Sequence, residues 1–455
     1  MERLFFLKLP VWSALLILVF IGIGVIFFGS IVKDETASRE NSSLQPSWSW
    51  VGVAAYELSS IPDTAKILMD SGGALHASNY KRFGDKIGWV TYDDSEDISG
   101  YLLFSRIDPV KEYTTVELID LSDKSVVHTW EPDPEVLLKD VERTSNIVRY
   151  TQWHRGRFRA MHPLLLEDGS LVMHGQFSPL LKLDHCGERL WIQAGANFHH
   201  SLNVDADGNF WAPTIIEPSE IFRDPQVRDD GLGHVSADGE LISNTSMAEI
   251  FERKGQAHLV VQAHSFSNDP LHMNDIQPAL EDGPYWKKGD LFISMRKKSL
   301  IALYRPSTDE IVWQKAGPWL VQHDIDIVND HVISIFDNAV KNRGKGGFIE
   351  ESSDIAFYDF RTDEVTFPFR ETSREARILA ITNGLNELTE SGHQIIEEDT
   401  SGRLLIYNSA GKLVEEFYNK ATSDGPAWRM SWSRYIPQAM GEKIVANLRK
   451  APTCN

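Results

Sequence analysis

The chain has 455 residues, and its 65 acidic and 45 basic residues give a formal net charge of −20. This acidic balance argues against a nucleic-acid partner and against peripheral binding to anionic lipid, because both need a basic face. With 42% hydrophobic residues and only two cysteines, Cys186 and Cys454, the chain is neither disordered nor built on a disulfide framework, and the sequence leaves open whether the two cysteines pair.

The first predicted element is the uncharged, apolar segment at residues 9–32. At about 1.5 Å per residue, a helix of this length spans a bilayer core of about 30 Å. Arg3 and Lys8 precede it, so residues 1–8 are expected in the cytoplasm and the rest of the chain in the periplasm or outside the cell. A cleaved signal peptide is the alternative, but its apolar region is shorter. We expect an uncleaved anchor, a polar tether at 33–50 and a helical or irregular segment at 51–86.

Residues 87–424 consist of short apolar runs separated by turns rich in Asp, Gly and Asn, which is typical of all-β structure. Two hairpin patterns alternate along them. In the first, a polar turn with one Lys or Glu joins two apolar stretches; its copies are centred on Lys124, Glu188, Glu240, Glu310, Glu364 and Lys412. The second begins with a histidine and continues into an aliphatic strand, a loop and a second strand; its copies begin at His162, His200, His272, His323 and His393.

Six units of two hairpins each predict an all-β fold, a six-bladed β-propeller with four strands in each blade, preceded by one transmembrane helix. A two-sheet sandwich is the alternative, and it suits two alternating kinds of hairpin less well. Residues 425–455 follow the last hairpin, and we expect them to close the ring or to cap it.

The recurrent histidine begins the strand that we take to be the innermost of each blade. Innermost strands line the central axis of a propeller, so equivalent positions on them face one another. The five imidazoles are therefore predicted to ring one mouth of the axial channel. A lone histidine at such a place is usually a packing residue, but five at one position favour a function as nucleophile, base or metal ligand.

Arg296 is predicted next to this ring, because it belongs to the strand that pairs with the His272 strand. A guanidinium there would clamp an anion, although a solvated Arg beside Lys297 and Lys298 is the simpler interpretation. The pairs Asn274–Asp275, Asp324–Asp326 and Asp337–Asn338 offer partners that could fix imidazole tautomers.

Histidines beside an arginine suit the transfer of a sulfuryl or phosphoryl group through a covalent imidazole carrier. An iron or zinc site is the competitor, and a guanidinium beside a dication weighs against it. The sequence contains neither a phosphate-binding glycine loop nor a dinucleotide fingerprint, so it indicates no nucleotide donor.

Two further features lie near the predicted channel mouth. The basic run at residues 154–159 stands out in an acidic protein, and it would either guide an anionic substrate or pair with surface carboxylates. Asn383, just before the last histidine hairpin, could also border the channel.

At these residues the chain resembles the nucleotide-independent aryl sulfotransferase family. The resemblance rests on NFHHSLNVDADGNFW, HMNDIQPAL, GDLFISMRKKSLIALYRP, IVWQKAGPW, QHDIDIV and ISIFDNA, which occur in this order between Asn197 and Ala339. It implies a propeller that moves a sulfuryl group, without a cofactor, from an aryl sulfate donor to a phenolic or related hydroxyl acceptor through a sulfated histidine.

Carried over to this sequence, the resemblance implies that His323 is the nucleophile. It also implies that His200, His272 and Arg296 bind the sulfuryl oxygens. His199 competes with His200 for its role. Further substrate-binding positions are expected at His199, Asn274, His162 and His393. A non-catalytic, membrane-tethered binding propeller and a histidine-ligated metalloenzyme remain as alternatives, and donor, acceptor and oligomeric state stay open.

Overall fold

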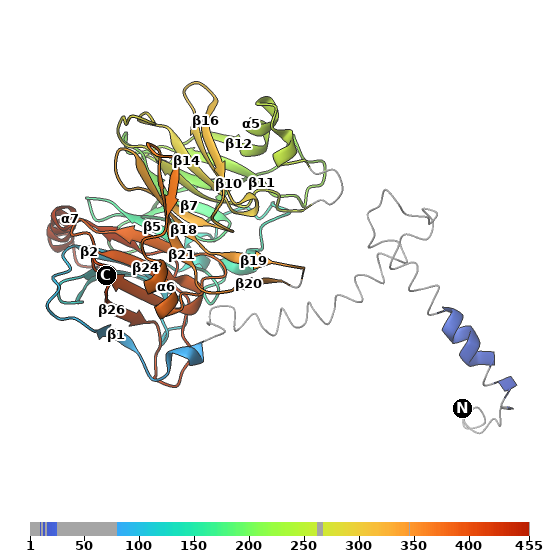
Figure 1. Cartoon of the computed structure of the whole chain (residues 1–455), viewed down its shortest axis with the longest axis horizontal. Helices are drawn as coiled ribbons and strands as arrows, with labels where there is room; N and C mark the ends of the chain where they lie inside the picture. Colours follow the sequence, from blue (N-terminus) through green and yellow to red (C-terminus); the bar gives the residue numbers. More distant parts are fainter. Residues whose placement is uncertain are drawn as a thin grey trace. The chain divides into compact units, whose positions relative to one another are not determined.

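The computed structural model describes residues 10, 12–13, 16–24, 80–261, 267–344 and 346–454 (Figure 1). The chain divides into two compact units, Met1–Ala74 and Leu75–Asn455. In the first unit, the described part contains a helical stretch at residues 16–24. Among all described residues, no helix has the length and apolar character needed to cross a bilayer. Much of the predicted anchor, all of the tether and residues 51–79 lie outside the described residues.

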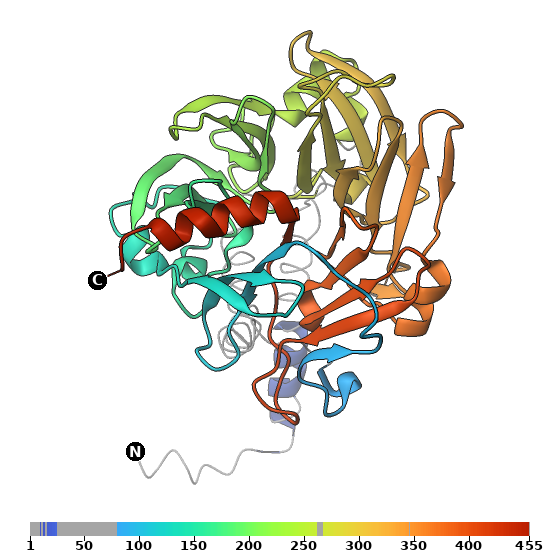
Figure 2. The same cartoon turned by 90° about the vertical axis from the view of Figure 1, so that its left-hand side faces the viewer.

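The second unit is an all-β propeller whose sheets are arranged around a centre (Figure 2). Three of its sheets have four strands each. The first is formed by β27 (Arg434–Ile436), β2 (Tyr101–Ile107), β3 (Thr114–Asp120) and β4 (Val126–Trp130). The second is formed by β13 (Met273–Pro278), β14 (Leu291–Met295), β15 (Leu300–Arg305) and β16 (Glu310–Ala316). The third is formed by β17 (His323–Ile327), β18 (Val332–Asp337), β21 (Asp354–Asp359) and β22 (Glu364–Thr366).

Two larger sheets complete the ring. A five-stranded sheet is formed by β23 (Leu385–Leu388), β24 (Gln394–Glu398), β25 (Arg403–Tyr407), β26 (Leu413–Tyr418) and β1 (Gly88–Thr91). An eight-stranded sheet contains β5 (Met161–Leu165), β6 (Leu171–His174), β7 (Ser178–Leu183), β8 (Arg189–Phe198), β9 (Asn203–Val204), β10 (Phe210–Ile216), β11 (Asp229–Val235) and β12 (Leu241–Ser246). A separate hairpin is formed by β19 (Val340–Asn342) and β20 (Gly347–Ile349).

The prediction of six separate four-stranded blades is therefore wrong in its count. Four sheets stand alone with four or five strands each, whereas the strands of two successive repeats, β5–β8 and β9–β12, form one continuous sheet. The cause is the length of β8, which has 10 residues. Its last residue, Phe198, pairs with Ser178 of β7 on one side and with Thr214 of β10 on the other.

The turns of the repeat use the side-chain chemistry that their sequence indicates. In the turn between β9 and β10, Oδ1 of Asp205 accepts the backbone N–H groups of Asp207 and Asn209, both at 2.9 Å. Gly208 completes the turn with a φ of 84°, which glycine adopts without steric cost. The same Asp–Gly pair occurs at Asp168–Gly169, between β5 and β6, and at Asp238–Gly239, between β11 and β12.

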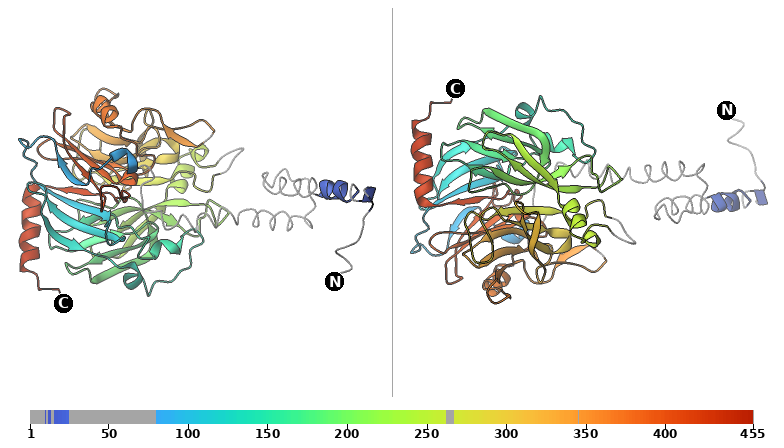
Figure 3. Two further views of the ribbon diagram at one scale, coloured as in Figure 1. Left: turned by 90° about the horizontal axis from the view of Figure 1, so that it is seen from below. Right: turned by 90° about the horizontal axis from the view of Figure 1, so that it is seen from above.

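The few helices lie between or outside the sheets. They are the helices α4 (Pro134–Leu137), α5 (Met247–Arg253), α6 (Arg370–Ala376) and α7 (Gln438–Lys450), and the 3₁₀ turns η2 (Tyr80–Phe83), η3 (Tyr150–Trp153), η4 (Ala257–Leu259), η5 (Arg296–Lys298) and η6 (Asp399–Ser401). The C-terminal segment that we expected to close or cap the ring contains both β27, which pairs with β2, and α7. Figure 3 shows α7 lying across one end of the propeller.

One disulfide ties the C-terminus to the eight-stranded sheet. Cys454, beyond α7, is bonded to Cys186 in the turn between β7 and β8, across 268 residues of sequence and a Cα–Cα distance of 5.4 Å. The bond holds α7 in place, and Asn447 of α7 also donates through Nδ2 to the carbonyl of Glu167 at 2.8 Å.

Removal of this bond is expected to destabilise the propeller. We expect Cys454→Ser to lower the free energy of unfolding by about 2–4 kcal/mol, because the open chain gains conformational entropy when it unfolds. The measurement is differential scanning calorimetry at one fixed scan rate. Dithiothreitol should lower the melting temperature of the native chain and leave that of the variant unchanged; equal melting temperatures of variant and native chain would contradict the prediction.

Candidate active site

The strands at the centre of the propeller begin at one common end. Around the axis, β9 contacts β13, β13 contacts β17, β17 contacts β23, β23 contacts β27 and β27 contacts β5. His162 lies in β5, His272 directly precedes β13, and His323 is the first residue of β17. The end opposite to them carries α7, because Glu167, which α7 contacts, follows β5. The histidines therefore line the mouth of the axis that α7 does not cover.

The backbone is strained at three histidines of this mouth. His162, His200 and His272 have φ values of 40°, 61° and 52°. Non-glycine residues rarely adopt such values, and where they do so the surrounding structure must enforce it, most often at functional sites. Asn383 before β23 and Trp432 before β27 have φ values of 58° and 66°, so they take the corresponding places where the sequence offers no histidine.

The imidazoles meet at the axis. The ring centroid of His200 lies 5.2 Å from that of His272 and 6.2 Å from that of His323. The indole of Trp432 lies beside them, with centroid distances of 6.0 Å to His323 and 5.6 Å to His162. We call His162, His199, His200, His272, His323 and Trp432 the histidine cluster.

The hydrogen bonds of His323 define its tautomer. Nδ2 of Asn338 donates to the carbonyls of Ala380 and Asn383 at 2.7 and 2.6 Å, so Oδ1 of Asn338 is left as an acceptor. It lies 2.7 Å from Nδ1 of His323, which must therefore carry the proton. The backbone N–H of Asn383 donates to Nε2 at 3.3 Å, as expected for an unprotonated nitrogen. Asn338 is thus one of the tautomer-fixing partners that the sequence suggested.

Burial and the positive charge of Arg296 lower the pKa of His323 well below its usual value. The fully buried imidazole is neutral at neutral pH and holds a lone pair on Nε2. A neutral imidazole of fixed tautomer is the form that can act as a nucleophile.

Arg296 and His272 are joined through the backbone. The N–H of Arg296, at the start of η5, donates to the carbonyl of His272 at 3.1 Å. Nδ1 of His272 donates to the carboxylate of Asp269, which leaves its Nε2 unprotonated in the neutral ring. Nε of Arg296 is buried, and it has no hydrogen-bond partner among the described residues. A buried guanidinium nitrogen without an acceptor indicates a place for an oxyanion.

Both members of the His199–His200 pair belong to the cluster, but they face different partners. Nε2 of His199 lies 3.2 Å from the carbonyl of Thr214 and donates to it, so Nδ1 of His199 accepts from Nδ1 of His200 at 2.8 Å. His200 faces the other imidazoles, whereas His199 contacts Nη2 of Arg228 at 3.2 Å. Burial lowers the pKa of both rings well below the usual value.

Arg228 and Trp432 are site residues that sequence reasoning missed. Arg228 is buried against His199 and donates through Nε to Asp230 at 2.7 Å. Trp432 is fully buried, and its indole N–H has no partner among the described residues. Arg228 precedes β11, an outer strand of its sheet, and Trp432 lies in the irregular segment before β27, so neither falls on the histidine repeat. For Trp432, the one available sequence signal was that an aromatic residue occurs in the segment expected to close the ring.

His393 does not join the cluster, so its predicted place on an innermost strand is wrong. It precedes β24, the second strand of its sheet, because the innermost strand is β23. Its ring contacts Ser391 at 2.8 Å and Glu96 at 3.3 Å instead. Asn274 links two inner strands: its Nδ2 donates to the carbonyl of Gln322 at 2.8 Å, whereas its buried Oδ1 lacks a partner among the described residues.

In the part of the chain that the structure describes, residues spaced closely enough to share a metal ion lie outside the histidine cluster. There, the one group of three His, Cys or acidic residues with ligand atoms within 4.8 Å of one another is His185, Cys186 and Cys454. Its two sulfur atoms are joined in the disulfide. The histidine cluster does not form such a group in the described residues.

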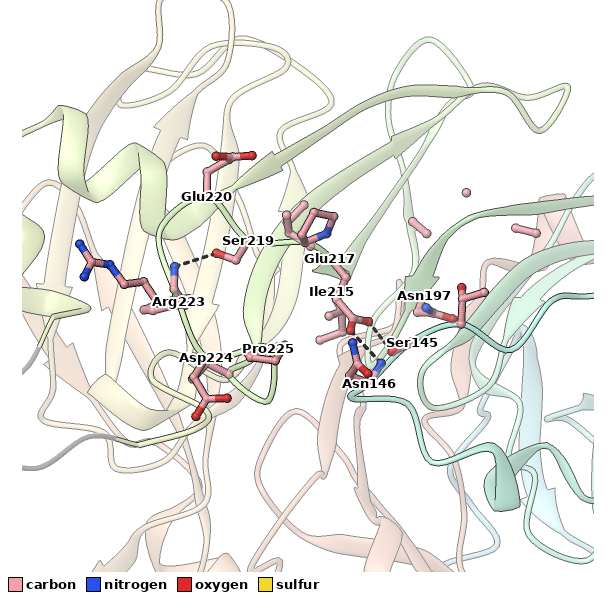
Figure 4. Close-up of a pocket in the computed structure, with 18 residues that line it drawn as sticks. Ser145, Asn146, Asn197, Ile215, Glu217, Ser219, Glu220, Arg223, Asp224 and Pro225 are labelled. Carbon is pink, nitrogen blue, oxygen red and sulfur yellow. Dashed lines mark hydrogen bonds between the residues drawn. The ribbon is translucent and has the colours of Figure 1, made fainter. Parts of the chain in front are cut away.

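A pocket of about 710 Å³, drawn in Figure 4, is lined by residues at the ends of β8 and β10 and by the loop that follows β10. Ile215 and Val227 line it, and they are the chain neighbours of Thr214 and Arg228, both of which contact His199. Glu217 forms part of one wall, where it accepts hydrogen bonds from the hydroxyl of Ser145 and, at 3.0 Å, from the backbone of Asn146. The lining mixes apolar side chains with hydrogen-bonding groups, which suits an organic molecule that carries polar substituents.

A propeller with buried, neutral imidazoles and a partly unpaired guanidinium at its axis belongs to the class of propellers equipped for oxyanion chemistry. The sequence model of the arylsulfotransferase (ASST) family matches residues 162–420, which include all the imidazoles of the cluster. The chain belongs to the arylsulfotransferase family.

No curated protein matches the chain. Among solved structures, a protein of unknown function from Bacteroides caccae aligns with 74% of this chain and 99% of its own length, at 11% identity and a TM-score of 0.44. Virginiamycin B lyase from Staphylococcus aureus aligns with 56% of this chain and 69% of its own, at 10% identity and a TM-score of 0.34. The WD40 β-propeller domain of Doa1 aligns with 75% and 89%, at 14% identity and a TM-score of 0.37.

Proposed function

We propose that the chain moves a sulfuryl group from an aryl sulfate ester to a phenolic or related hydroxyl acceptor, with His323 as the covalent carrier. The observation that carries the proposal is the environment of His323: a buried neutral ring whose Nδ1–H is held by Asn338, beside the unpartnered Nε of Arg296. Membership of the arylsulfotransferase family supports the same chemistry.

In the first half of the reaction, Nε2 of His323 attacks the sulfur atom of the donor. The S–N bond forms, the S–O bond to the aromatic ring breaks, and a phenolate leaves. The 3.3 Å contact from the N–H of Asn383 is given up as the Nε2 lone pair bonds to sulfur. The sulfated ring then carries a positive charge, which Oδ1 of Asn338 stabilises through Nδ1–H.

Arg296 supplies permanent donors to the non-bridging sulfuryl oxygens. His200 and His272 both hold their proton on Nδ1 when neutral, so each donates from Nε2 only after it takes up a second proton. A bound sulfate ester favours that protonation, because an anion stabilises the charged form. In the second half, His272 is neutral again because its extra proton has passed to the leaving phenolate. Its Nε2 accepts the proton of the acceptor hydroxyl as the hydroxyl oxygen attacks sulfur and the S–N bond breaks.

Mass spectrometry of the intact protein tests the proposal. We expect the protein exposed to 4-nitrophenyl sulfate without acceptor to gain the mass of one sulfuryl group, located on His323 by peptide sequencing. One equivalent of 4-nitrophenol should appear in a burst, and addition of phenol should remove the label as phenyl sulfate. Transfer without any labelled histidine would overturn the role of His323.

The pH dependence of labelling follows from the lowered pKa of His323. A histidine with the usual pKa of about 6.5 would lose half of its neutral form at that pH. Because the pKa of His323 lies well below this value, its neutral form persists as the pH falls, and it is lost only as the pH passes through the lowered pKa. We expect the single-turnover rate of labelling to stay constant from pH 7.5 to pH 6; a midpoint near pH 6.5 would contradict the assignment.

We also propose that residues 9–32 anchor the chain in the membrane with the propeller outside the cytoplasm. The uncharged segment supports this arrangement, as does the Cys186–Cys454 disulfide, since such bonds persist in oxidising compartments. The full chain should remain in the membrane fraction after an alkaline wash, and deletion of residues 1–35 should release it. Release of the full chain by that wash would contradict the anchor.

A further inference from the structure

Two arginines share one carboxylate close to the nucleophile. Nη1 of Arg159, the last residue of the basic run at 154–159, donates to the two carboxylate oxygens of Asp399 at 3.3 and 3.1 Å. Nε and Nη2 of Arg429 donate to Oδ1 of the same carboxylate at 3.2 and 3.1 Å. Asp399 is fully buried, and it faces both guanidinium groups at once. We call Arg159 and Arg429 the arginine pair.

The arginine pair carries more positive charge than its ion-pair partner neutralises. Asp399 is the one carboxylate that forms ion pairs with these arginines in the described structure. The next acidic group is Glu397, whose oxygens accept the N–H groups of Trp432 and Ser433, at 2.8 Å each, and the hydroxyl of Ser433. Burial raises the pKa of Glu397 to about 7, so it is only partly ionised near neutral pH. One excess positive charge therefore remains on a largely buried pair.

The pair lies at the catalytic mouth of the propeller. Arg159 precedes β5, Asp399 follows β24 and Arg429 precedes β27, so all three occupy the end at which the inner strands begin. Asn383 connects them to the site: its Nδ2 donates to Oδ2 of Asp399 at 2.9 Å, and its backbone N–H contacts Nε2 of His323. One residue thus separates the carboxylate of the pair from the proposed nucleophile.

The pair retains donors for another acceptor. The hydrogen bonds of Arg159 to the described residues use Nη1 alone, which also donates to the carbonyl of Met430 at 3.4 Å, and those of Arg429 use Nε and Nη2. Nε and Nη2 of Arg159 and Nη1 of Arg429 therefore form no hydrogen bond with the described residues, and the two side chains are 12% and 20% exposed. Guanidinium groups bind carboxylates and sulfates through two parallel hydrogen bonds. A partly exposed pair with excess positive charge and unused donors is suited to bind an oxyanion.

We propose that Arg159 and Arg429 bind a second oxyanion of the substrate, so that the preferred substrates are aromatic molecules that carry a further negative charge beside the sulfate ester or the accepting hydroxyl. The inference rests on the proposed function, because it places this charge relative to the sulfuryl group on His323. The transferred group is held by Arg296 and the imidazoles, and the arginine pair selects the molecule that bears it.

Donors that differ in one charge test the inference. The probes are 4-sulfooxybenzoate and 3-(4-sulfooxyphenyl)propanoate, each compared with its methyl ester. In the native chain we expect kcat/KM for the acids to exceed that for the esters by about tenfold or more, since a charge-assisted hydrogen bond contributes this much. Arg429→Gln should reduce the ratio to near one while Arg159 continues to pair with Asp399. Arg429→Lys should recover part of the ratio.

Two controls separate binding from folding. Arg361→Gln removes an exposed arginine that pairs with Asp359 on the turn between β21 and β22, away from the catalytic mouth, and it should leave the ratio unchanged. Melting temperatures report whether each variant is folded. Equal kcat/KM for acids and esters in the native chain, or a ratio that Arg429→Gln leaves intact, would overturn the inference.

A binding measurement without turnover distinguishes failure of the inference about the arginine pair from failure of the proposed function. Isothermal titration of His323→Ala with 4-sulfooxybenzoate should give a dissociation constant about tenfold lower than with the methyl ester, and the added Arg429→Gln change should abolish the difference. Transfer from both kinds of donor without a preference for the acids would refute the inference alone. A lack of any transfer, with Arg429-dependent binding intact, would refute the proposed function alone.

Discussion

Replacing His323 by alanine is expected to abolish the sulfated protein and to lower kcat for transfer from 4-nitrophenyl sulfate to phenol by about 10⁴-fold or more, which is typical for loss of a covalent nucleophile. The physical reason is that, among the described residues, no other imidazole of the cluster has its tautomer fixed by a side-chain amide as Asn338 fixes that of His323. The measurements are intact-protein mass and steady-state release of 4-nitrophenol.

The matched control is His331→Ala. His331 lies in the turn between β17 and β18, where it pairs with Asp330, and it is outside the histidine cluster. Its removal should leave labelling and turnover unchanged. Retention of the label in His323→Ala would show that another residue carries the sulfuryl group, and the peptide that bears the label would identify it.

Replacing Arg296 by alanine is expected to have the second large effect on sulfuryl transfer. Loss of the half-buried guanidinium should lower kcat/KM by about 10²–10³-fold, because preorganised charge at the sulfuryl oxygens stabilises the transition state. The charge of Arg296 also lowers the pKa of His323, so its removal should shift the acidic limb of the labelling profile to higher pH. Single-turnover labelling between pH 4.5 and 8 measures both effects.

The conservative and control variants separate charge from shape. Arg296→Lys keeps the charge but lacks the planar fork of donors, so it should restore the position of the acidic limb and only part of the rate. Arg361→Gln, which removes an exposed arginine, should change neither. An Arg296→Ala variant with native rate and native pH profile would place the sulfuryl group elsewhere.

Much of the site was predictable because it repeats. His162, His200, His272 and His323 recur at the start of successive inner strands, and pseudosymmetry about the axis brings such positions together. The same reasoning failed at His393, where the hairpin that begins with histidine consists of the second and third strands of its sheet rather than the first and second. A hairpin pattern identifies paired strands, but it does not state which one is innermost.

Site residues that do not belong to the histidine repeat could not be predicted from it. Trp432 reaches the axis because the C-terminal strand β27 closes the sheet that begins with β2, a pairing between the two ends of the propeller chain. Arg228 and Asp269 lie in loops at the mouth that the histidines line. The two arginines of the arginine pair are 270 positions apart in the sequence and bind the same carboxylate. Long-range pairings of this kind leave no periodic signal.

The sequence by itself determined the all-β class, the recurring turns and the set of imidazoles, because these depend on local alternation, on Asp–Gly turn chemistry and on spacing within a repeat. Only the tertiary structure decided which hydrogen bonds hold each imidazole in its tautomer, which arginines keep unused donors and how many sheets are continuous. Those properties depend on burial and on contacts between distant segments, and burial is the largest cause of the lowered pKa of His199, His200 and His323.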